Sequence, residues 1–217
     1  MIEHLTSFIP LAIILPVIAG IIRVREIAED YYYFFAYLFL GFLTDYSASF
    51  IFTLDESKKF VYLLYSIISV FLLLAIIYQW SGLRRNGAKF WVFIVILLMG
   101  VFIDILNPNN NNFHLIGTKI NLIILVFLLI ELLGKLISRA APPLYKNSKV
   151  IIVFCTILYL LIFVTVTVYI DLLYKRERQY FFLKLYLVHQ LVTLLMYIFY
   201  TLAILWAPKK EKFMSHF

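Results

Sequence analysis

The stretch LYLVHQLVTLLMYIFYTLAILW, residues 185–206, contains no Asp, Glu, Lys or Arg and is long enough to cross a lipid bilayer as an α-helix. About 20 apolar residues in a helix span the ~30 Å hydrocarbon layer of a membrane. The segment APKKEK, residues 207–212, follows with a proline and three lysines, a combination typical of the cytoplasmic end of a span. The stretch also carries His189, and polar residues inside a span commonly face the bundle interior and mark function.

Composition places the whole chain among integral membrane proteins. Of its 217 residues, 64% are hydrophobic and 14% are charged, and the mean hydropathy is +0.96. Soluble domains are typically about 45–50% apolar and about 25% charged. We therefore expect an all-α, polytopic membrane protein that forms a single domain over residues 1–217 in the lipid bilayer, without a separate soluble catalytic domain.

Apolar runs separated by charged or proline-containing connections predict seven transmembrane helices in one bundle. The predicted spans are residues 8–24, 31–52, 60–80, 90–106, 119–138, 150–174 and 185–206. The first span contains Pro10 and Pro16, and proline inside a helix removes a hydrogen bond and kinks it. We therefore expect the first helix to bend.

The distribution of basic residues between the two sides of the membrane predicts the orientation. The connections place 7 of the 19 Lys and Arg residues on the side of the N-terminus and 12 on the opposite side. Because cytoplasmic loops carry the excess of Lys and Arg, we expect a multi-pass protein of the cell (inner) membrane with its N-terminus outside and its C-terminus cytoplasmic. The same asymmetry accounts for the net charge of +7, so nucleic acid is not expected as a partner.

Two polar residues lie well inside predicted spans and at similar depth. Asp45 is in the second span and His189 in the seventh, both in the outer half under the predicted orientation. An ionised carboxylate facing lipid is costly, so Asp45 should be protonated or paired, and His189 is the nearest partner by depth. The pair is a candidate ligand, proton or metal site, with an Asp–His hydrogen bond that fixes helix packing as the alternative.

The remaining acidic residues near the spans have simpler interpretations. Glu131 in the fifth span precedes Lys135 by four residues, which puts both on one helix face and predicts an ion pair, with a role in proton movement as the alternative. Asp104 and Asp171 mark the outer ends of the fourth and sixth spans, and His114 lies in the outer loop. We expect these three residues to be solvated at the outer rim.

Sequence motifs for catalysis or for cofactor binding are missing. There is no HExxH, no GxSxG and no Ser–Lys pair placed as nucleophile and base. The last span lacks the deep lysine that a retinal Schiff base needs, and the interrupted, repeated helices of secondary transporters are not visible. We expect no metal and no cofactor, and an enzyme is not favoured. The lone Cys155 cannot form an intrachain disulfide.

Four segments carry a resemblance to a known group of proteins: GFLTDYS (41–47), FLLIELLGKL (127–136), PPLYKNSKVIIVF (142–154) and LVHQLVTLLMYIFYTLAILW (187–206). In these segments the chain resembles small seven-helix membrane proteins of unassigned activity that are common in Bacteroidota. The resemblance implies a polar signature of Asp45, Glu131 and His189 in a sensor-like bundle without an output domain. Ser69 stands where the pattern leads us to expect an acidic residue, which argues against a carboxylate-rich metal site.

Several functions remain open from the sequence. The first is a sensor or receptor that binds a small or lipidic ligand in the outer half of the bundle and signals to a cytoplasmic protein partner at the basic inner rim. The second is a homo-oligomeric channel, proton pathway or membrane-acting effector that uses His189, Asp45 and Glu131. A third is an intramembrane enzyme that acts on lipid with Asp45 and His189 as acid and base. The fourth is an accessory subunit of a larger membrane complex.

Overall fold

The computed structural model describes residues 10–47, 55–81, 87–106, 116–139, 143–174 and 179–210. In this part of the chain it is helical, with one isolated antiparallel bridge between Ile27 and Lys209. The seven α-helices are α2 (Ile14–Arg23), α3 (Tyr32–Tyr46), α4 (Asp55–Ser81), α5 (Gly87–Leu106), α6 (Ile116–Arg139), α7 (Ser148–Tyr174) and α8 (Gln179–Trp206). Three short 3-10 helices accompany them: η1 (Pro10–Ile13), η2 (Glu29–Tyr31) and η5 (Leu144–Lys146).

Four of these helices are long and apolar enough to cross a membrane. The qualifying segments are Leu64–Ser81, Gly117–Arg139, Ser148–Tyr169 and Lys184–Trp206. Ile14–Arg23 and Trp91–Asp104 are shorter apolar helices, and the α3 helix ends at Tyr46, whereas residues 48–52 of the predicted second span lie outside the described residues. The prediction of an all-helical membrane protein is confirmed at this level, and the count of seven spans stays a prediction.

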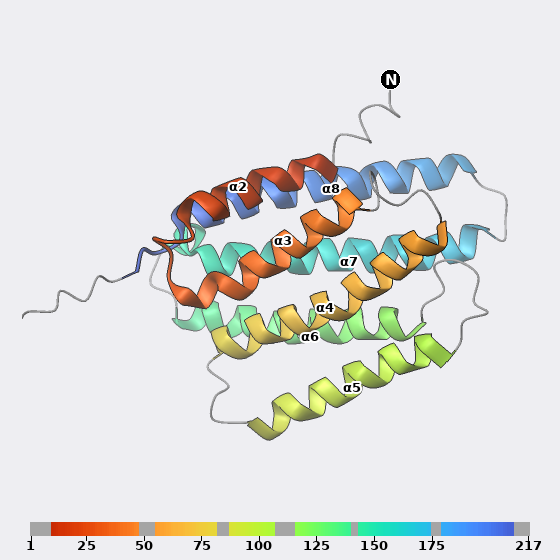
Figure 1. Ribbon diagram of the computed structural model, residues 1–217, viewed down its shortest axis with the longest axis horizontal. Helices are drawn as coiled ribbons and strands as arrows, with labels where there is room; N and C mark the ends of the chain where they lie inside the picture. Colours follow the sequence, from red (N-terminus) through yellow and green to blue (C-terminus); the bar gives the residue numbers. More distant parts are fainter. Residues whose placement is uncertain are drawn as a thin grey trace, which may run out of the picture.

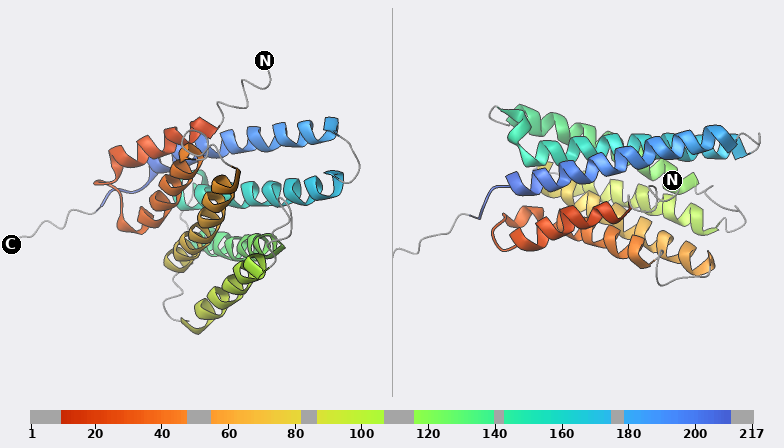
Figure 2. Two further views of the ribbon diagram at one scale, coloured as in Figure 1. Left: turned by 45° about the vertical axis from the view of Figure 1, so that its right-hand side comes forward. Right: turned by 90° about the horizontal axis from the view of Figure 1, so that it is seen from above.

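Successive helices run in opposite directions through one elongated bundle (Figure 1). The most extensive contact is between α7 and α8, and α6 packs between α7, α5 and α4. The α2 helix lies along α8 and the α3 helix along α4, so the first helix of the chain packs on the last (Figure 2). The α5 helix is peripheral because it packs on α6 and only slightly on α4.

Large apolar side chains on the facing sides of these helices form the core. Leu125, Leu129 and Leu132 on α6 are almost fully buried, as are Ile152 on α7 and Ile204 on α8. Their spacing of three and four residues on α6 follows the helical repeat, so one stripe of this helix faces inward. The outward sides of the same helices are also apolar, as expected for a protein surrounded by lipid.

The two prolines lie in the first helical segment. Pro10 opens η1, and Pro16 lies in the first turn of α2. The backbone runs from η1 into α2 without a break, since Ile13 is itself in the αR conformation, and the geometry changes from 3-10 to α between Ile13 and Ile14. The bend of the first helix stays a prediction.

Arg23 at the end of α2 closes the C-terminus of α8. Its guanidinium donates hydrogen bonds to the backbone carbonyls of Ile204 (2.6 Å), Leu205 and Ala207 (3.3 Å). The last carbonyls of a helix lack partners within the helix and carry partial negative charge. Arg23 therefore satisfies these carbonyls and holds α2 against α8.

A second group of polar contacts joins α3, α4 and α7 at the same end. Lys149 forms an ion pair with Asp30, and its Nζ atom lies 5.6 Å from the ring centroids of both Tyr31 and Trp80. The indole of Trp80 donates to the Asp30 carbonyl at 2.9 Å, and the hydroxyls of Tyr31 and Ser148 are 2.5 Å apart. These contacts lock three helix ends together with charge-assisted and aromatic interactions.

The segment after α8 folds back on the connection between α2 and α3. Lys209 pairs with Glu26 at 3.3 Å, and Lys210 pairs with Glu29 at 3.1 Å. Hydrogen bonds with Tyr32 and then with Glu29 raise the pKa of the Lys210 ammonium group above its usual value. We call this end of the bundle the basic end; its described basic residues are Arg23, Arg25, Arg139, Lys146, Lys149, Lys209 and Lys210.

The contacts of Arg23 lead to a stability prediction. Arg23→Met keeps an unbranched side chain but removes its hydrogen bonds to the α8 carbonyls, so we expect the free energy of unfolding to fall by about 1–3 kcal/mol. Equilibrium denaturation of the purified protein in detergent measures this change. Arg25→Met is the control, because Arg25 is an exposed arginine two residues away with none of these contacts. Equal loss in both variants would contradict the role of Arg23.

Candidate functional site

Asp45 lies in the last turn of α3 and faces the interior only in part. Among the described residues, its carboxylate forms no hydrogen bond and no ion pair. It lies within electrostatic range of Tyr37, Tyr159 and Tyr197. A carboxylate on an apolar helix is costly without a partner, so this position needs an explanation beyond packing.

His189 lies between α7 and α8 with an unused nitrogen. Its imidazole ring packs against Tyr159 and Phe163, with 5.7 Å between ring centroids in both cases. The Nε2 atom is buried and has no hydrogen-bond partner in the described part of the chain. Buried polar atoms in native proteins are nearly always paired, so a lone imidazole nitrogen is a candidate contact for a bound molecule.

The structure brings Asp45 and His189 to one tyrosine but does not join them directly. Tyr159 contacts the His189 ring, and its hydroxyl is within electrostatic range of Asp45. The expected Asp–His hydrogen bond is not formed in the described residues. Tyr159 interacts with both residues, which leaves the carboxylate and the imidazole each with free hydrogen-bonding capacity.

The sequence analysis missed a cluster of tyrosines that surrounds this position. This tyrosine cluster consists of the side chains of Tyr37 on α3, Tyr65 on α4, Tyr159 on α7, and Tyr197 and Tyr200 on α8. The Tyr37 and Tyr65 side chains are hydrogen-bonded to each other. Electrostatic interactions connect the Tyr65 hydroxyl to those of Tyr159 and Tyr197.

Thr156 extends the cluster toward the basic end. The hydroxyls of Thr156 and Tyr200 are 2.7 Å apart, and Thr156 also lies 2.7 Å from the Ile152 carbonyl, to which it donates. Tyr200 is fully buried and packs edge-on against Phe34 with 5.0 Å between centroids. A bundle with apolar outer faces thus contains a hydroxyl-rich interior formed by four helices.

A spacing on α8 is the signal that could have revealed the cluster. His189, Thr193, Tyr197 and Tyr200 recur at intervals of four, four and three residues, which places them on one helix face. Thr193, Tyr197 and Tyr200 are all buried. A polar face on an otherwise apolar span predicts a polar interior, whereas the number of tyrosines alone indicates only interfacial or packing residues.

Glu131 is separate from this site. Its carboxylate lies 2.5 Å from Lys135 Nζ, which is the ion pair that the spacing predicts. The Glu131 side chain is 60% exposed on the outer surface of α6. In this arrangement Glu131 does not continue a series that begins at His189 and Asp45.

Asp104 is buried, contrary to the expectation of a solvated residue at the outer rim. It is 7% exposed, and its two oxygens accept hydrogen bonds from the backbone N–H groups of Gly117 (2.7 Å) and Thr118 (2.6 Å) at the start of α6. The Thr118 hydroxyl donates a third bond at 2.7 Å. The side chain leaves the rim because it satisfies the unpaired N–H groups of the next helix. His114 and the side chain of Asp171 lie outside the described residues.

Removal of the Asp104 carboxylate should weaken the packing of α5 on α6. Asp104→Ala loses three hydrogen bonds at a helix N-terminus, so we expect the free energy of unfolding to fall by about 1–3 kcal/mol. Denaturation in detergent measures this loss, with Phe102→Leu on the exposed face of the same helix as the control. An Asp104→Ala protein as stable as the control would show that Asp104 does not cap α6.

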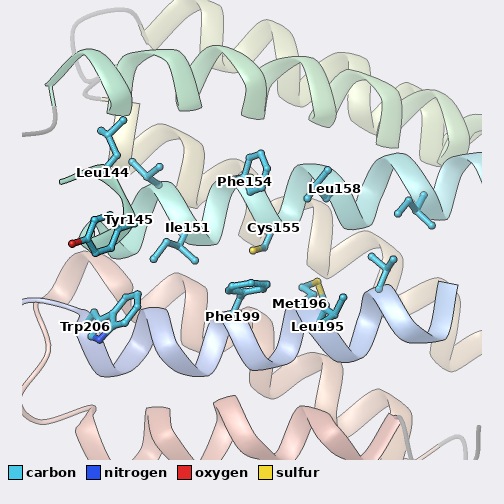
Figure 3. Close-up of a pocket in the computed structure, with 13 residues that line it drawn as sticks. Leu144, Tyr145, Ile151, Phe154, Cys155, Leu158, Leu195, Met196, Phe199 and Trp206 are labelled. Atoms are coloured by element: carbon cyan, nitrogen blue, oxygen red, sulfur yellow. The ribbon is translucent and has the colours of Figure 1, made fainter. Parts of the chain in front are cut away.

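An apolar groove of about 520 Å³ lies between α7 and α8 (Figure 3). Tyr145 and Trp206 are at its basic end, Val192 is the lining residue nearest to His189 in sequence, and Ile162 is adjacent to Phe163, which packs on the His189 ring. The other lining residues are Leu144, Val150, Ile151, Phe154, Cys155, Leu158, Leu195, Met196 and Phe199. The groove therefore extends along the same two helices that hold the His189 ring.

In the described residues, no three His, Cys, Asp or Glu side chains gather in a way that could hold a metal ion. The site instead offers hydroxyls that donate and accept hydrogen bonds, one carboxylate and one imidazole. Together with the groove, it suits an amphipathic molecule better than a metal ion. Comparison of the chain with protein-family models, curated proteins and solved structures found no match.

Proposed function

We propose that this chain is a multi-pass membrane sensor or receptor that binds a small or lipidic ligand between α3, α7 and α8. The observation that carries the proposal is the buried His189 Nε2, which has no hydrogen-bond partner among the described residues, beside Tyr159, which lies within electrostatic range of the Asp45 carboxylate. A bound molecule that donates to the carboxylate and pairs with the imidazole would satisfy both groups. We also propose that the chain crosses the inner membrane seven times, with the basic end in the cytoplasm.

The groove would hold the apolar part of the proposed ligand. It is apolar along its length, and His189 is three residues beyond Val192 on α8. A hydrocarbon chain placed in the groove would bring a polar head group to His189 and Asp45. Because Asp45 has no cationic partner among the described residues and lies within electrostatic range of Tyr37, Tyr159 and Tyr197, the favoured head group is an amine or ammonium.

Transmission to a cytoplasmic partner is supported by the contacts at the basic end. Helices α3, α7 and α8 of the site are the helices that Arg23, Asp30 and Lys149 tie together there. A ligand that shifts α7 against α8 would displace these ends as well. Arg25 and Lys146 are exposed there, have no ion pair among the described residues, and are available to an acidic partner.

The other functions have less support. A proton pathway through His189, Asp45 and Glu131 is interrupted because Glu131 is on the outer surface of α6. An enzyme that acts on lipid would use Asp45 and His189 as acid and base, and the two groups do not contact each other directly. The role of an accessory subunit is compatible with the exposed apolar faces of the bundle.

Photolabelling with three single-chain amphiphiles tests the proposal. Each probe has the same 16-carbon chain with a diazirine, and the head groups are an amine, an alcohol and a carboxylate. In nanodiscs that contain the purified protein, we expect the probes to label peptides from α7 and α8. The amine probe should give half-maximal labelling at the lowest concentration. Asp45→Asn should weaken binding of the amine probe about tenfold, because a charge-assisted hydrogen bond is lost, and should leave binding of the alcohol probe nearly unchanged.

Two tryptophan variants of α8 provide the matched control. Leu195→Trp fills the groove, whereas Ile198→Trp adds the same side chain at an exposed position outside the groove. We expect Leu195→Trp to reduce labelling by all three probes and Ile198→Trp to leave it unchanged. Equal labelling of the two variants, or no preference for the amine in the wild type, would contradict the proposed site.

A further inference from the structure

Residues 207–210, which follow α8, form a strap across the connection between α2 and α3 (Figure 1). Ile27 of the connection and Lys209 of the strap form an antiparallel bridge. On the two sides of this bridge, backbone hydrogen bonds of 2.6 Å and 3.3 Å join the strap to the connection. Each such bond adds only modestly to stability, because water replaces it when the two segments separate.

Two ion pairs at the surface complete this contact. Lys209 pairs with Glu26 at 3.3 Å, and these side chains are 72% and 53% exposed. Lys210 pairs with Glu29 at 3.1 Å, the Glu29 side chain is 76% exposed, and the Lys210 ammonium lies 5.1 Å from the centroid of the Tyr32 ring. Exposed ion pairs contribute little to stability, because water and salt screen them. The interactions that close the strap are therefore ones that a competing anion can replace.

The neighbouring ion pair of Asp30 and Lys149 is less exposed. Its side chains are 26% and 27% exposed, and the Lys149 ammonium also lies 5.6 Å from the ring centroids of Tyr31 and Trp80. The last carbonyls of α8 are held separately by Arg23. These contacts keep the helix ends together without the strap. Opening of the strap therefore leaves the bundle intact.

The strap begins at the level where the apolar layer of a membrane ends. The α8 helix is one of the four helices able to cross a membrane, and it ends at Trp206, which is 47% exposed. Tryptophan at the end of a span is typical of the head-group layer. Lys209 and Lys210 follow Trp206 by three and four residues. An anionic bilayer surface attracts lysine and repels glutamate, so its field acts on both members of each ion pair in the direction of opening.

We propose that Lys209 and Lys210 form a binding site for the phosphates of anionic lipids. In the closed strap, the carboxylates of Glu26 and Glu29 occupy this site in place of the phosphate oxygens. The inference requires that α8 crosses the bilayer, and it does not depend on a ligand at His189. The gain from two lysines at an anionic surface is similar in size to the loss of two exposed ion pairs. The lipid composition of the membrane therefore sets the balance between the closed and the open strap.

Lipid phosphates fit the strap better than an acidic protein does. Adjacent lysines on an extended segment are flexible point charges, which bind phosphate without a fixed geometry. Lipid phosphates are already present at this level of the membrane, whereas a protein has to be recruited. Arg25 and Lys146, which are exposed at the same end, add to the positive potential that attracts anionic lipid.

A distance measurement between two spin labels tests the exchange. In a Cys155→Ala background, the labels are attached to Arg25→Cys on the connection and Pro208→Cys on the strap, two exposed positions that leave both ion pairs in place. The full chain is placed in nanodiscs of phosphatidylcholine, with or without an equal amount of phosphatidylglycerol. We expect one short distance in phosphatidylcholine, and a ratio of open to closed strap about three- to tenfold higher with phosphatidylglycerol. The same distances in both lipids would overturn the proposal.

Charge variants assign the response to the strap. Lys209→Gln combined with Lys210→Gln should abolish the effect of phosphatidylglycerol, whereas Lys146→Gln, an exposed lysine at the same end outside the strap, should keep it. Glu26→Gln combined with Glu29→Gln should open the strap in phosphatidylcholine alone, because the two lysines lose their partners within the chain. A response that persists without the two strap lysines, or a strap that stays closed without the two carboxylates, overturns the proposal.

Inorganic phosphate separates a free anion from a lipid as the source of the phosphate group. Phosphatidylcholine nanodiscs are measured in phosphate and in chloride buffer at the same ionic strength. We expect the strap to stay closed in both buffers, because a free anion lacks the surface potential of many lipid charges. Opening by inorganic phosphate alone would overturn the assignment to anionic lipid.

Discussion

A polar side chain on an apolar, lipid-crossing helix raises the free energy of the protein until it finds a partner. The described residues meet this constraint in two ways. Asp104 turns inward and accepts three hydrogen bonds at the start of α6. Lys149 and Arg23 bind anions or carbonyls at the helix ends. Asp45 has no hydrogen bond or ion pair among the described residues, and the buried Nε2 atom of His189 has no partner there, as is also true of one side-chain oxygen each of Asp30 and Asn121.

The basic end shows how the constraint produces a rigid region. Arginine, lysine and aromatic side chains there contact helix ends that are far apart in the sequence, including the α2–α8 and α3–α7 pairs. Each contact satisfies a group that a helix terminus would otherwise leave unpaired. Much of the positive charge that the orientation rule assigns to the cytoplasmic side is therefore engaged within the chain. The number of basic residues available to a partner is correspondingly smaller.

The helices and the ion pair within one helix could be predicted from the sequence, whereas contacts between different helices could not. The apolar runs predict the long helices closely, because about 20 apolar residues have few other folds available. The Glu131–Lys135 pair follows from its spacing alone. The bond from Asp104 to Gly117 depends on how α5 and α6 meet, which no local pattern specifies.

The tyrosine cluster was missed for a related reason. Its members come from α3, α4, α7 and α8, and each tyrosine taken alone is an ordinary residue for a membrane helix. Only the polar face of α8, from His189 to Tyr200, indicates that one interior is hydroxyl-rich. Depth predicts a similar level for Asp45 and His189 but not that Tyr159 packs on the His189 ring, because depth specifies position along the bundle axis and not around it.

The candidate site and the outer face of α6 are connected through the core. The α7 helix holds Tyr159 on one side and packs on α6 through Ile152 and Val153, which are buried in the same core as Leu125 and Leu129. Close-packed interiors transmit displacements and do not absorb them. A ligand that moves α7 would therefore also move α6, whose outer face carries the exposed ion pair. In the proposed receptor, ligand binding between α7 and α8 would thus change the position of α6 as well.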